Sequence, residues 1–505
     1  KGLIQVQEQQ PDRAEPQEFG FRHILIQQAA YRAILKSARA QLHESVADWM
    51  ETGVGERSSQ WIEVIGHHLE QAAHYRRELQ QEAQSAELGR RATTYLRRAG
   101  RAALALGDAA AAVSAFERAR GLLTASDPDR APILTGLGAA LFEAGRLSEA
   151  KDALDTAQQV AAAQGQDGFA AHAKVQALLL DLHLDPGAAT AKVEQSVPML
   201  RATFTRDGDE LGLCRTWQLE AAVRWARARS ADAEQAWERA AASARAADDQ
   251  RHLTRSLRWL ASAALWGPTP AGVGITRCES YLQEIGSTPT GRAVIFLHTA
   301  GLYAMSDRLV TARELLERGA AILQDVGSNL PMAVAEPAAF VAMLTDDAPA
   351  AERYLRSAYD RLRDIGEQAD LSTTAALLAR AIAVQGRARH DEADSLVAIS
   401  WAAGGGQDLS AMIIGNCVRA RVLAARGPFG DAVGLAEDAV ALAAKTDFVH
   451  QHGDTLLDLG HVLAASDRHD DARKAILAAR TLYDGKGSVL GVRACDRLLA
   501  PDGSR

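Results

Sequence analysis

Histidines that stand close enough in the sequence to share a metal ion occur at two places. His67 and His74 are seven residues apart, which is two turns along one face of a helix, and His68 follows His67 directly. Neutral imidazole is a common zinc ligand, but a protein site needs at least three ligands, and this face offers only two. His450 and His452 would point to different faces of a helix. We therefore expect these imidazoles to pack or to form hydrogen bonds, and we expect no bound metal.

Two groups of acidic residues stand where the sequence predicts turns between helices. They are Asp346 with Asp347, and the segment HDDARK at residues 469–474. An Asp side chain accepts hydrogen bonds from backbone amides at a helix N-terminus and is favoured by the helix dipole, which is worth about 1 kcal/mol for a cap. We expect helix capping at these positions and no acid–base catalysis.

Motifs for covalent or phosphate chemistry are missing. No Ser, Cys or Lys stands in a recognisable nucleophile motif. The segments GVGERSS and DGKGSVLG lack the GxxxxGK[ST] spacing that lets backbone amides cradle phosphates. We therefore predict no catalytic residue, no bound cofactor and no enzyme activity for this chain.

Five of the eight tryptophans lie in the middle of the sequence. Large aromatic side chains fill irregular contacts between helices, and they are also favoured at recognition surfaces. The sequence leaves both interpretations open, and the second makes the cluster a candidate groove for a ligand or a peptide. Its members are Trp217, Trp225, Trp237, Trp259 and Trp266.

Composition and charge narrow the class of protein. The 505 residues are 47% hydrophobic and 24% charged, and the formal net charge is −8. Lys and Arg are scattered without long runs, so we expect no nucleic-acid surface. No apolar run approaches the ~18 residues of a spanning helix and no signal-peptide pattern is present, so we expect no membrane partner. The cysteines are too far apart for a CxxC pair and are typical of reduced thiols in a cytoplasmic protein: Cys214, Cys278, Cys417 and Cys495.

A repeat of about 40 residues is the strongest signal in the sequence. The segment YLRRAGRAALALGDAAAAVSAFERARGLL fits the pattern of one tetratricopeptide helix pair. In that pattern a small residue, a turn residue, a small, a large and a small residue follow in order, and here they are Gly100, Gly107, Ala112, Phe116 and Ala119. The same register recurs along the chain, most clearly with Gly138, Gly145, Ala150, Leu154 and Ala157, with Ala300, Asp307, Ala312 and Leu316, and with Gly460, Asp467, Ala472, Ile476 and Ala479.

The spacing of these turns predicts about ten helix pairs in an all-α, right-handed tetratricopeptide-like solenoid. We place the pairs at residues 91–486, linking helices at 31–90, and a capping helix with a frayed tail at 487–505. The pairs near Asp185 and Gly267 should be irregular, because Pro186, Pro268 and Pro270 interrupt helices there.

The first residues do not follow the helical pattern. LIQVQEQ and EFGFRH are short alternating runs joined by a polar loop with Pro11 and Pro16, which predicts a β-hairpin. The following segment, FRHILIQQAAYRAILKSARAQLHESVADWM, resembles the part that follows the nucleotide-binding domain in bacterial signal-transduction ATPases, and WIEVIGHHLEQAAHY resembles their next helix. The resemblance implies that residues 1–30 are the remnant of a winged helix, with the hairpin as its wing, and that the chain is part of a larger protein.

The C-terminal half resembles the helical-repeat tail of bacterial multidomain adenylate/guanylate cyclases that carry an ATPase domain. The segment TLYDGKGSVLGVRACDRLL is similar to the LYxxKGNVxxAxRARxLL motif that closes that tail, with changes at Ser488 and Cys495. No cyclase metal-binding carboxylate motif is recognisable in this chain, so the resemblance implies that both catalytic units lie upstream.

These observations predict a non-catalytic regulatory or protein-interaction module in bacterial signal transduction. Its partner would be a protein, the upstream ATPase domain, or a small effector. The alternative is the repeat region of an ATPase-type transcription regulator, although such proteins usually end in a helix-turn-helix and this chain ends in APDGSR. A free-standing enzyme on a helical solenoid is the third hypothesis.

Overall fold

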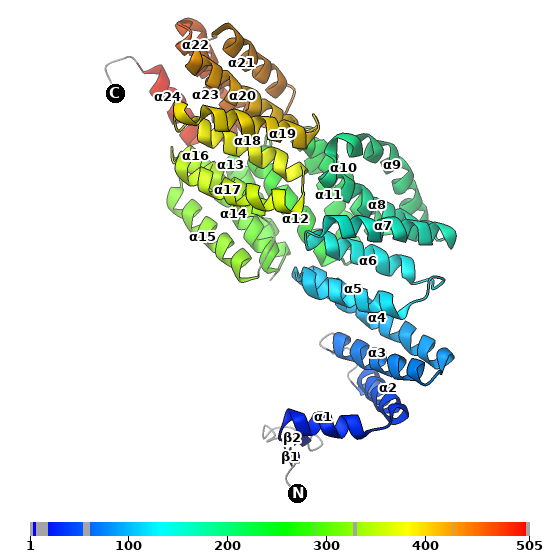
Figure 1. Cartoon of the computed structure of the whole chain (residues 1–505). Coiled ribbons are helices and arrows are strands. Elements are labelled where there is room, and N and C mark those ends of the chain that lie inside the picture. Colours follow the sequence, from blue (N-terminus) through cyan, green and yellow to red (C-terminus); the bar gives the residue numbers. More distant parts are fainter. Residues whose placement is uncertain are drawn as a thin grey trace. The chain divides into compact units, whose positions relative to one another are not determined.

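The computed structural model describes residues 4–6, 19–53, 61–286, 288–326, 331–427 and 429–500. The chain divides into two compact units. Unit 1 comprises Lys1–Ala102 and Ala112–Ile133, and unit 2 comprises Ala103–Ala111 and Leu134–Arg505. Figure 1 shows the succession of helices along the chain.

The described residues are almost entirely helical. The first elements are β1 (Ile4–Val6), β2 (Phe19–Phe21), α1 (Ile24–Ala33), α2 (Lys36–Gly53), α3 (Ile62–Glu78), α4 (Glu82–Leu106), α5 (Ala109–Leu122), α6 (Arg130–Glu143), α7 (Leu147–Ala163), α8 (Asp167–Leu184), α9 (Pro186–Asp207), α10 (Glu210–Ala226), α11 (Ser230–Ala246) and α12 (Gln250–Trp266). The remaining elements are α13 (Ala271–Glu284), α14 (Pro289–Met305), α15 (Leu309–Asp325), α16 (Pro331–Leu344), α17 (Ala348–Ile365), α18 (Ala369–Ala383), the 3-10 turn η2 (Arg387–Arg389), α19 (His390–Gly404), α20 (Leu409–Arg426), α21 (Phe429–Ala443), α22 (Val449–Ala465), α23 (His469–Lys486) and α24 (Val489–Leu499). The architecture is therefore all-α and built from successive helices in tetratricopeptide-like pairs.

The two short strands pair antiparallel, with Ile4 opposite Phe21 and Val6 opposite Phe19. The predicted loop with Pro11 and Pro16 lies outside the described residues, as does the predicted tail at 501–505. The winged-helix interpretation and the domain boundaries at residues 30, 90 and 486 therefore stay predictions, and so does the right-handed sense of the array.

The spacing of small and turn residues explains how the helices pair. Gly107, Gly145 and Asp467 all have positive φ, between 61° and 83°, so the chain reverses within a few residues. A Cβ atom on Gly138 would lie 2.5 Å from Leu154 of the next helix, and one on Gly460 would lie 2.8 Å from Ile476. Small residues at these positions let the two helices of a pair approach closely, as the repeat register predicts.

The even-numbered helices of unit 2 form a continuous layer. Each of them from α8 to α20 contacts the next even-numbered helix, so that α8 is followed by α10, α12, α14, α16, α18, α20 and α22. Three further contacts join helices that are ten apart in the chain: α8 with α18, α12 with α22, and α14 with α24. The array of unit 2 therefore turns back on itself after five helix pairs.

Buried polar contacts hold this closure. The Nζ atom of Lys486, at the end of α23, donates to the carbonyl oxygens of Ala264, Gly267 and Thr269 at 2.8, 2.7 and 2.6 Å. All three ammonium protons are thereby satisfied, and the cation lies at the negative C-terminus of α12. Lys486 has no exposed surface, and burial lowers its pKa to about 7, against the attraction of Glu234. The side chain thus replaces the solvent that would otherwise cap α12.

A second closing contact comes from Asp447, two positions before the start of α22. Asp447 accepts hydrogen bonds from the backbone amides of Ser230 (2.6 Å) and Ala231 (2.7 Å), at the first turn of α11. Its own amide donates to the carbonyl oxygen of Ala228 at 3.2 Å. Helix ends in the middle of the chain are thus capped by residues that follow more than 200 positions later.

Prolines start some helices and lie inside others. Pro186 begins α9 and Pro270 precedes α13, as the irregular pairs predicted. Pro198 and Pro337 instead lie inside α9 and α16. None of the helices in the described ranges is long and apolar enough to cross a membrane.

The two acidic turn segments behave differently from each other. Asp347 is the N-cap of α17 and accepts from Ala350 N at 3.0 Å, as predicted, whereas Asp346 takes the left-handed turn position with φ 59°. At 469–474 the capping prediction is wrong: the N-cap of α23 is Arg468, and its side chain forms no capping bond. Asp471 lies inside the first turn and pairs with Arg468. Asp471 therefore pairs with a neighbouring cation and does not cap the helix. Of the two effects expected at this segment, only the favourable position of a negative charge near the positive end of the helix dipole is found.

Candidate ligand cavity

A cavity of about 710 Å³ lies within unit 2. Its wall comes mainly from the even-numbered helices α8, α10, α12, α16, α18, α20, α22 and α24. Its volume falls within the range of ligand pockets in proteins, about 300–1,000 Å³. The closure of unit 2 therefore converts the inner layer of helices into the wall of a pocket.

One side of the cavity is aromatic. The ring centroids of Trp225 and Trp259 lie 5.7 Å apart, and those of Trp225 and Phe448 lie 5.0 Å apart. Trp266 packs edge-on against Phe340 at 4.9 Å. All five side chains line the cavity. These rings provide flat apolar faces with negative electrostatic potential, which suit planar or cationic groups.

The five predicted tryptophans divide into two sets. Trp225, Trp259 and Trp266 come together in the cavity wall. Trp237 is only 1% exposed and stacks on Trp259 at 5.1 Å, so it fills the core behind that wall. Trp217 does not line the cavity; it lies beneath Arg201 and Arg239, with their guanidinium carbons 3.9 and 4.7 Å from its ring centroid.

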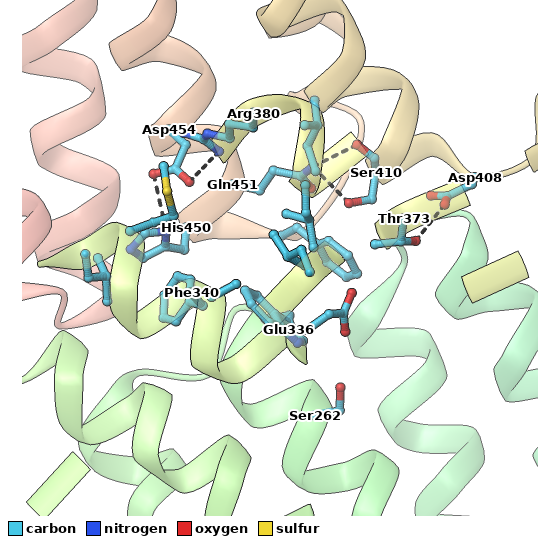
Figure 2. Close-up of a pocket in the computed structure, with 18 of the residues that line it drawn as sticks. Ser262, Glu336, Phe340, Thr373, Arg380, Asp408, Ser410, His450, Gln451 and Asp454 are labelled. Carbon is cyan, nitrogen blue, oxygen red and sulfur yellow. Dashed lines mark hydrogen bonds and ion pairs between the residues drawn. The ribbon is translucent and has the colours of Figure 1, made fainter. Parts of the chain in front are cut away.

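A second side of the cavity carries charges that neutralise each other. Arg380 contacts Asp454 at 3.0 Å, and Asp454 also accepts from the Tyr483 hydroxyl at 2.5 Å. Burial alone would raise the pKa of Asp454, but Arg380 and His450 outweigh it and hold that pKa well below its usual value. Arg421 contacts Asp458 at 2.8 Å. Figure 2 shows the linked group of Arg380, Asp454 and His450, apart from Glu336.

Glu336 and Asp370 have no such partner among the described side chains. Both line the cavity, and neither carboxyl forms an ion pair or hydrogen bond with a side chain in the described ranges. Burial, with the nearby carboxyls of Asp370 and Asp408, raises the pKa of Glu336 to about 8. Burial and Glu367 raise the pKa of Asp370 to about 7, although His183 opposes them. The nearby cationic group is His183, which also lines the cavity but is paired with Glu367 at 2.8 Å, so neither Glu336 nor Asp370 has an ion-pair partner of its own among the described side chains.

Asp408 belongs to the same part of the cavity but is satisfied. Its carboxyl is the N-cap of α20 and accepts from Ala411 N at 2.9 Å and from the Thr373 hydroxyl at 2.7 Å. Burial raises its pKa in spite of these hydrogen bonds. Asp408 thus has a structural role and also adds negative potential beside Glu336.

Two of the histidines singled out in the sequence, His68 and His450, form hydrogen bonds, whereas His67 packs against the rings of His43 and His68 and His74 lies 3.7 Å from Glu78. In unit 1, His68 Nδ1 lies 2.8 Å from Nδ1 of His43, whose Nε2 lies 2.7 Å from the Tyr31 hydroxyl. Burial lowers the pKa of His43 to about 4, and His68 and His67 add to the effect. In unit 2, His450 is buried and contacts the Ser488 hydroxyl at 3.2 Å.

Metal ligation has no support in the part of the chain that the structure describes. Within these ranges no group of three or more His, Cys, Asp or Glu residues is arranged to hold a metal ion. The four cysteines are buried as free thiols.

Sequence reasoning missed the acidic residues of the cavity. A signal was present for Glu336, because it is the one charged residue in PMAVAEPAAFVAML, the otherwise apolar sequence of α16. A carboxyl in an apolar helix is costly to bury and so indicates a special environment. Asp370 offers no such signal, because it stands in the first turn of α18, where an acidic residue is ordinary.

Comparison with known proteins identifies the fold and nothing narrower. No family model and no curated protein matches the sequence. Among solved structures, a Rap protein complexed with Competence and Sporulation Factor matches with a TM-score of 0.51 and 10% identity, over 70% of this chain and 98% of that one. The APC/C hetero-tetramer Cut9–Hcn1 matches with a TM-score of 0.50 and 13% identity, over 95% and 97% of the two chains. At such identities the likeness shows the fold alone, and the chain is a tetratricopeptide-like helical-repeat protein.

Proposed function

We propose that this chain is a non-catalytic regulatory module that binds a small effector in the cavity of unit 2 and presents its helical repeats to a protein partner. The observation that carries the proposal is the cavity itself, a space of about 710 Å³ whose wall is assembled from eight helices of the inner layer. A ligand that contacts so many helices at once binds the closed arrangement better than any opened one. Ligand binding would therefore stabilise unit 2 as a whole.

The similar structures support the interaction part of the proposal. The Rap protein was solved in complex with a factor, and Cut9 was solved in a hetero-tetramer with Hcn1. Helical-repeat arrays expose extended surfaces that suit such partners. For this chain we propose a protein partner or an ATPase domain of the same polypeptide.

The larger protein that we propose is a cytoplasmic bacterial signalling protein resembling an adenylate/guanylate cyclase with an ATPase domain. The support is the sequence resemblance at both ends of the chain, including TLYDGKGSVLGVRACDRLL. Reading the coding sequence upstream of Lys1 tests this proposal directly. A cyclase domain followed by an ATPase domain is the expected result, and a DNA-binding domain in place of the cyclase would favour the transcription-regulator alternative.

We propose further that the chain by itself has no enzyme activity and needs no cofactor, because it lacks a phosphate-binding loop and a nucleophile motif. The purified chain should neither hydrolyse ATP nor form a cyclic nucleotide above the level of a mock preparation. Turnover that co-purifies with the chain and disappears on its removal would contradict this.

Effector binding can be measured by the intrinsic fluorescence of the cavity tryptophans and by thermal unfolding. A panel of cationic, neutral and anionic aromatic molecules that fit the cavity should include at least one that binds with one-to-one stoichiometry. Leu377 lines the cavity, so Leu377→Trp should fill part of it and weaken that binding at least about tenfold, a loss of about 1.4 kcal/mol. Leu477→Trp, at an exposed position of α23, is the matched control and should bind as the wild type does. Absence of binding across the whole panel would overturn the effector proposal.

A further inference from the structure

The charges around the cavity do not balance. Six acidic residues and three arginines line it. The arginines are all engaged: Arg380 with Asp454, Arg421 with Asp458, and Arg497 with Asp346 at 3.4 Å. The remaining acids are Glu336, Asp370 and Asp408. Three carboxyls thus share one part of the cavity that provides no arginine for them among the described residues, and His183, which lines it too, is paired with Glu367.

Glu336 differs from the other acidic residues of the cavity in its surroundings. The Glu336 side chain is partly exposed, lines the cavity, and has no hydrogen-bond partner among the described side chains. A ligand that displaces water from this carboxyl must satisfy it in turn, because an unpaired carboxylate shielded from water costs free energy. The same helix, α16, brings Phe340 one turn away, and Figure 2 shows both side chains projecting from that helix.

The aromatic wall continues from this point. Phe340 packs against Trp266 at 4.9 Å and against His450 at 5.0 Å. A positive charge beside the Glu336 carboxyl would therefore have aromatic rings within reach as well as an anion. Aromatic faces and carboxylates together attract organic cations such as alkylammonium groups. A metal ion fits less well, since the described residues offer no set of three ligands.

We propose that the cavity of unit 2 takes an organic cation with an apolar or aromatic body, whose charged nitrogen lies against Glu336 and Asp370 while its body packs on Phe340, Trp266 and the neighbouring rings. The inference rests on the proposed function, because it specifies the chemical class of the effector that the cavity binds. It also assigns a role to the one carboxyl in the otherwise apolar helix α16, because the ligand supplies the partner of that carboxyl.

Three probes of nearly equal size test the charge preference. They are 4-phenylbutylammonium, 4-phenylbutan-1-ol and 4-phenylbutyrate, which carry a positive charge, no charge and a negative charge. We expect the cation to bind the wild-type chain at least about tenfold more tightly than the alcohol, with the anion weakest. Calorimetry gives each Kd, and fluorescence of the cavity tryptophans confirms the location.

Variants identify the responsible carboxyls. Glu336→Gln and Asp370→Asn should each remove most of the preference for the cation over the alcohol, and thermal unfolding shows that each variant is folded. Asp346→Asn is the matched control, because Asp346 lines the same cavity but is exposed and already paired with Arg497. It should retain the full preference.

Proton release provides an independent readout. Glu336 faces Asp370 and Asp408, and Asp370 faces Glu367 and His183. A bound cation favours the ionised carboxyl, so binding at neutral pH should release protons, and affinity for 4-phenylbutylammonium should rise between pH 6 and 9. An alkylammonium group, like lysine with its pKa of about 10.4, stays charged across this range. Glu336→Gln should reduce both effects.

The possible failures are distinguishable. If the alcohol or the anion binds as tightly as the cation, the cation proposal is overturned while the effector-binding proposal stands. The same holds if none of the three probes binds and only neutral or anionic members of the wider panel do. If Glu336→Gln and Asp370→Asn both keep the wild-type preference, these carboxyls do not receive the charge. If nothing in the wider panel binds, both proposals fail together.

Discussion

Unit 1 and unit 2 use the same local rules and reach different results. In both, small residues allow close helix contacts: Gly100 meets Phe116 in unit 1, and Gly138 meets Leu154 in unit 2. In the described part of unit 1, the hydrogen bond with the widest sequence separation joins Arg118 to Glu63, 55 positions apart. In unit 2, Lys486 and Ala264 are 222 positions apart. We infer from this difference that the closure of unit 2 depends on the number of successive helix pairs and on a few capping residues, and not on another kind of repeat.

One titrating group in each unit shows the effect of burial on an acid and on a base. In unit 1, the pKa of His43 is lowered to about 4, chiefly by burial and then by His68 and His67. In unit 2, the pKa of Glu336 is raised to about 8, again chiefly by burial. Burial favours the neutral form of both groups, so the contributions of His43 and Glu336 to stability should depend on pH in opposite directions.

The largest effect is expected from Lys486→Met. The substitution leaves three carbonyl oxygens at the end of α12 without their donor, so unit 2 should lose about 3 kcal/mol or more of its free energy of unfolding. Amide exchange should become faster at the end of α12 as well as in α23, while unit 1 keeps its protection. Lys474→Met, at an exposed position of α23, is the control and should change little. If protection is lost in α23 and α24 alone, the closing contact contributes nothing to α12 and unit 2 behaves like an open array.

A pH comparison should give a smaller effect with opposite signs. The raised pKa of Glu336 means that the folded chain binds more protons than the unfolded one between pH 4.5 and about 8, so its contribution to stability falls as the pH rises. Because the pKa of His43 is lowered, the folded chain binds fewer protons than the unfolded one between about pH 4 and 6.5, so the contribution of His43 to stability is lost as the pH falls. Each pKa unit corresponds to about 1.4 kcal/mol as an upper limit.

Two variants isolate these contributions. Relative to the wild type, Glu336→Gln should become progressively more stable as the pH rises from 5 to 8. The His43→Gln variant should lose less stability than the wild type when the pH falls from 6.5 to 4. Chemical unfolding at several pH values, followed by a probe in each unit, measures both slopes. Parallel pH profiles of variant and wild type would show that the group in question does not titrate in the folded chain as described.

The smallest effect is expected from two matched insertions of volume. Ala119 in unit 1 and Ala479 in unit 2 stand at the same repeat position, and both have no exposed surface. Phe at either position should overpack the helix pair and cost about 1–3 kcal/mol. Exchange should increase only in neighbouring helices for Ala119→Phe, but should extend to α12 for Ala479→Phe, because α23 carries Lys486. Equally local changes in both variants would remove the distinction between the two units.

The sequence predicted the helices and their close contacts well, because these depend on residues that lie close together in the chain. Gly138 and Leu154, or Gly460 and Ile476, meet within one pair, so their spacing is visible in the register. The cavity depends instead on how far each pair is rotated from the last, and small rotations add up over five pairs. No local pattern reports that sum, so the approach of α12 to α22 and the enclosure of Glu336 and Asp370 could not be read from the sequence.

For the tryptophan cluster, too, the sequence did not show how each side chain is placed. Its position in the middle repeats was visible in the sequence, but which of its members fill the core and which face the cavity was not. Trp237 fills the core, whereas Trp225, Trp259 and Trp266 face the cavity. Trp259 lies one turn before Ala263 on α12, and its orientation is set by the helices around it rather than by its neighbours in the sequence. Whether these rings bind a ligand stays a prediction.

The hydrogen bonds from Lys486 to the end of α12 also fix when, during synthesis of the chain, this helix end can be capped. A ribosome adds about 5–20 residues per second, so the interval between Ala264 and Lys486 takes roughly ten to forty seconds. During that interval the nascent chain carries α12 with carbonyl oxygens at its end that still lack their ammonium donor, and Trp266 lacks its ring partner until Phe340 has been added. The middle of the chain is therefore synthesised long before the contact that caps α12 can form.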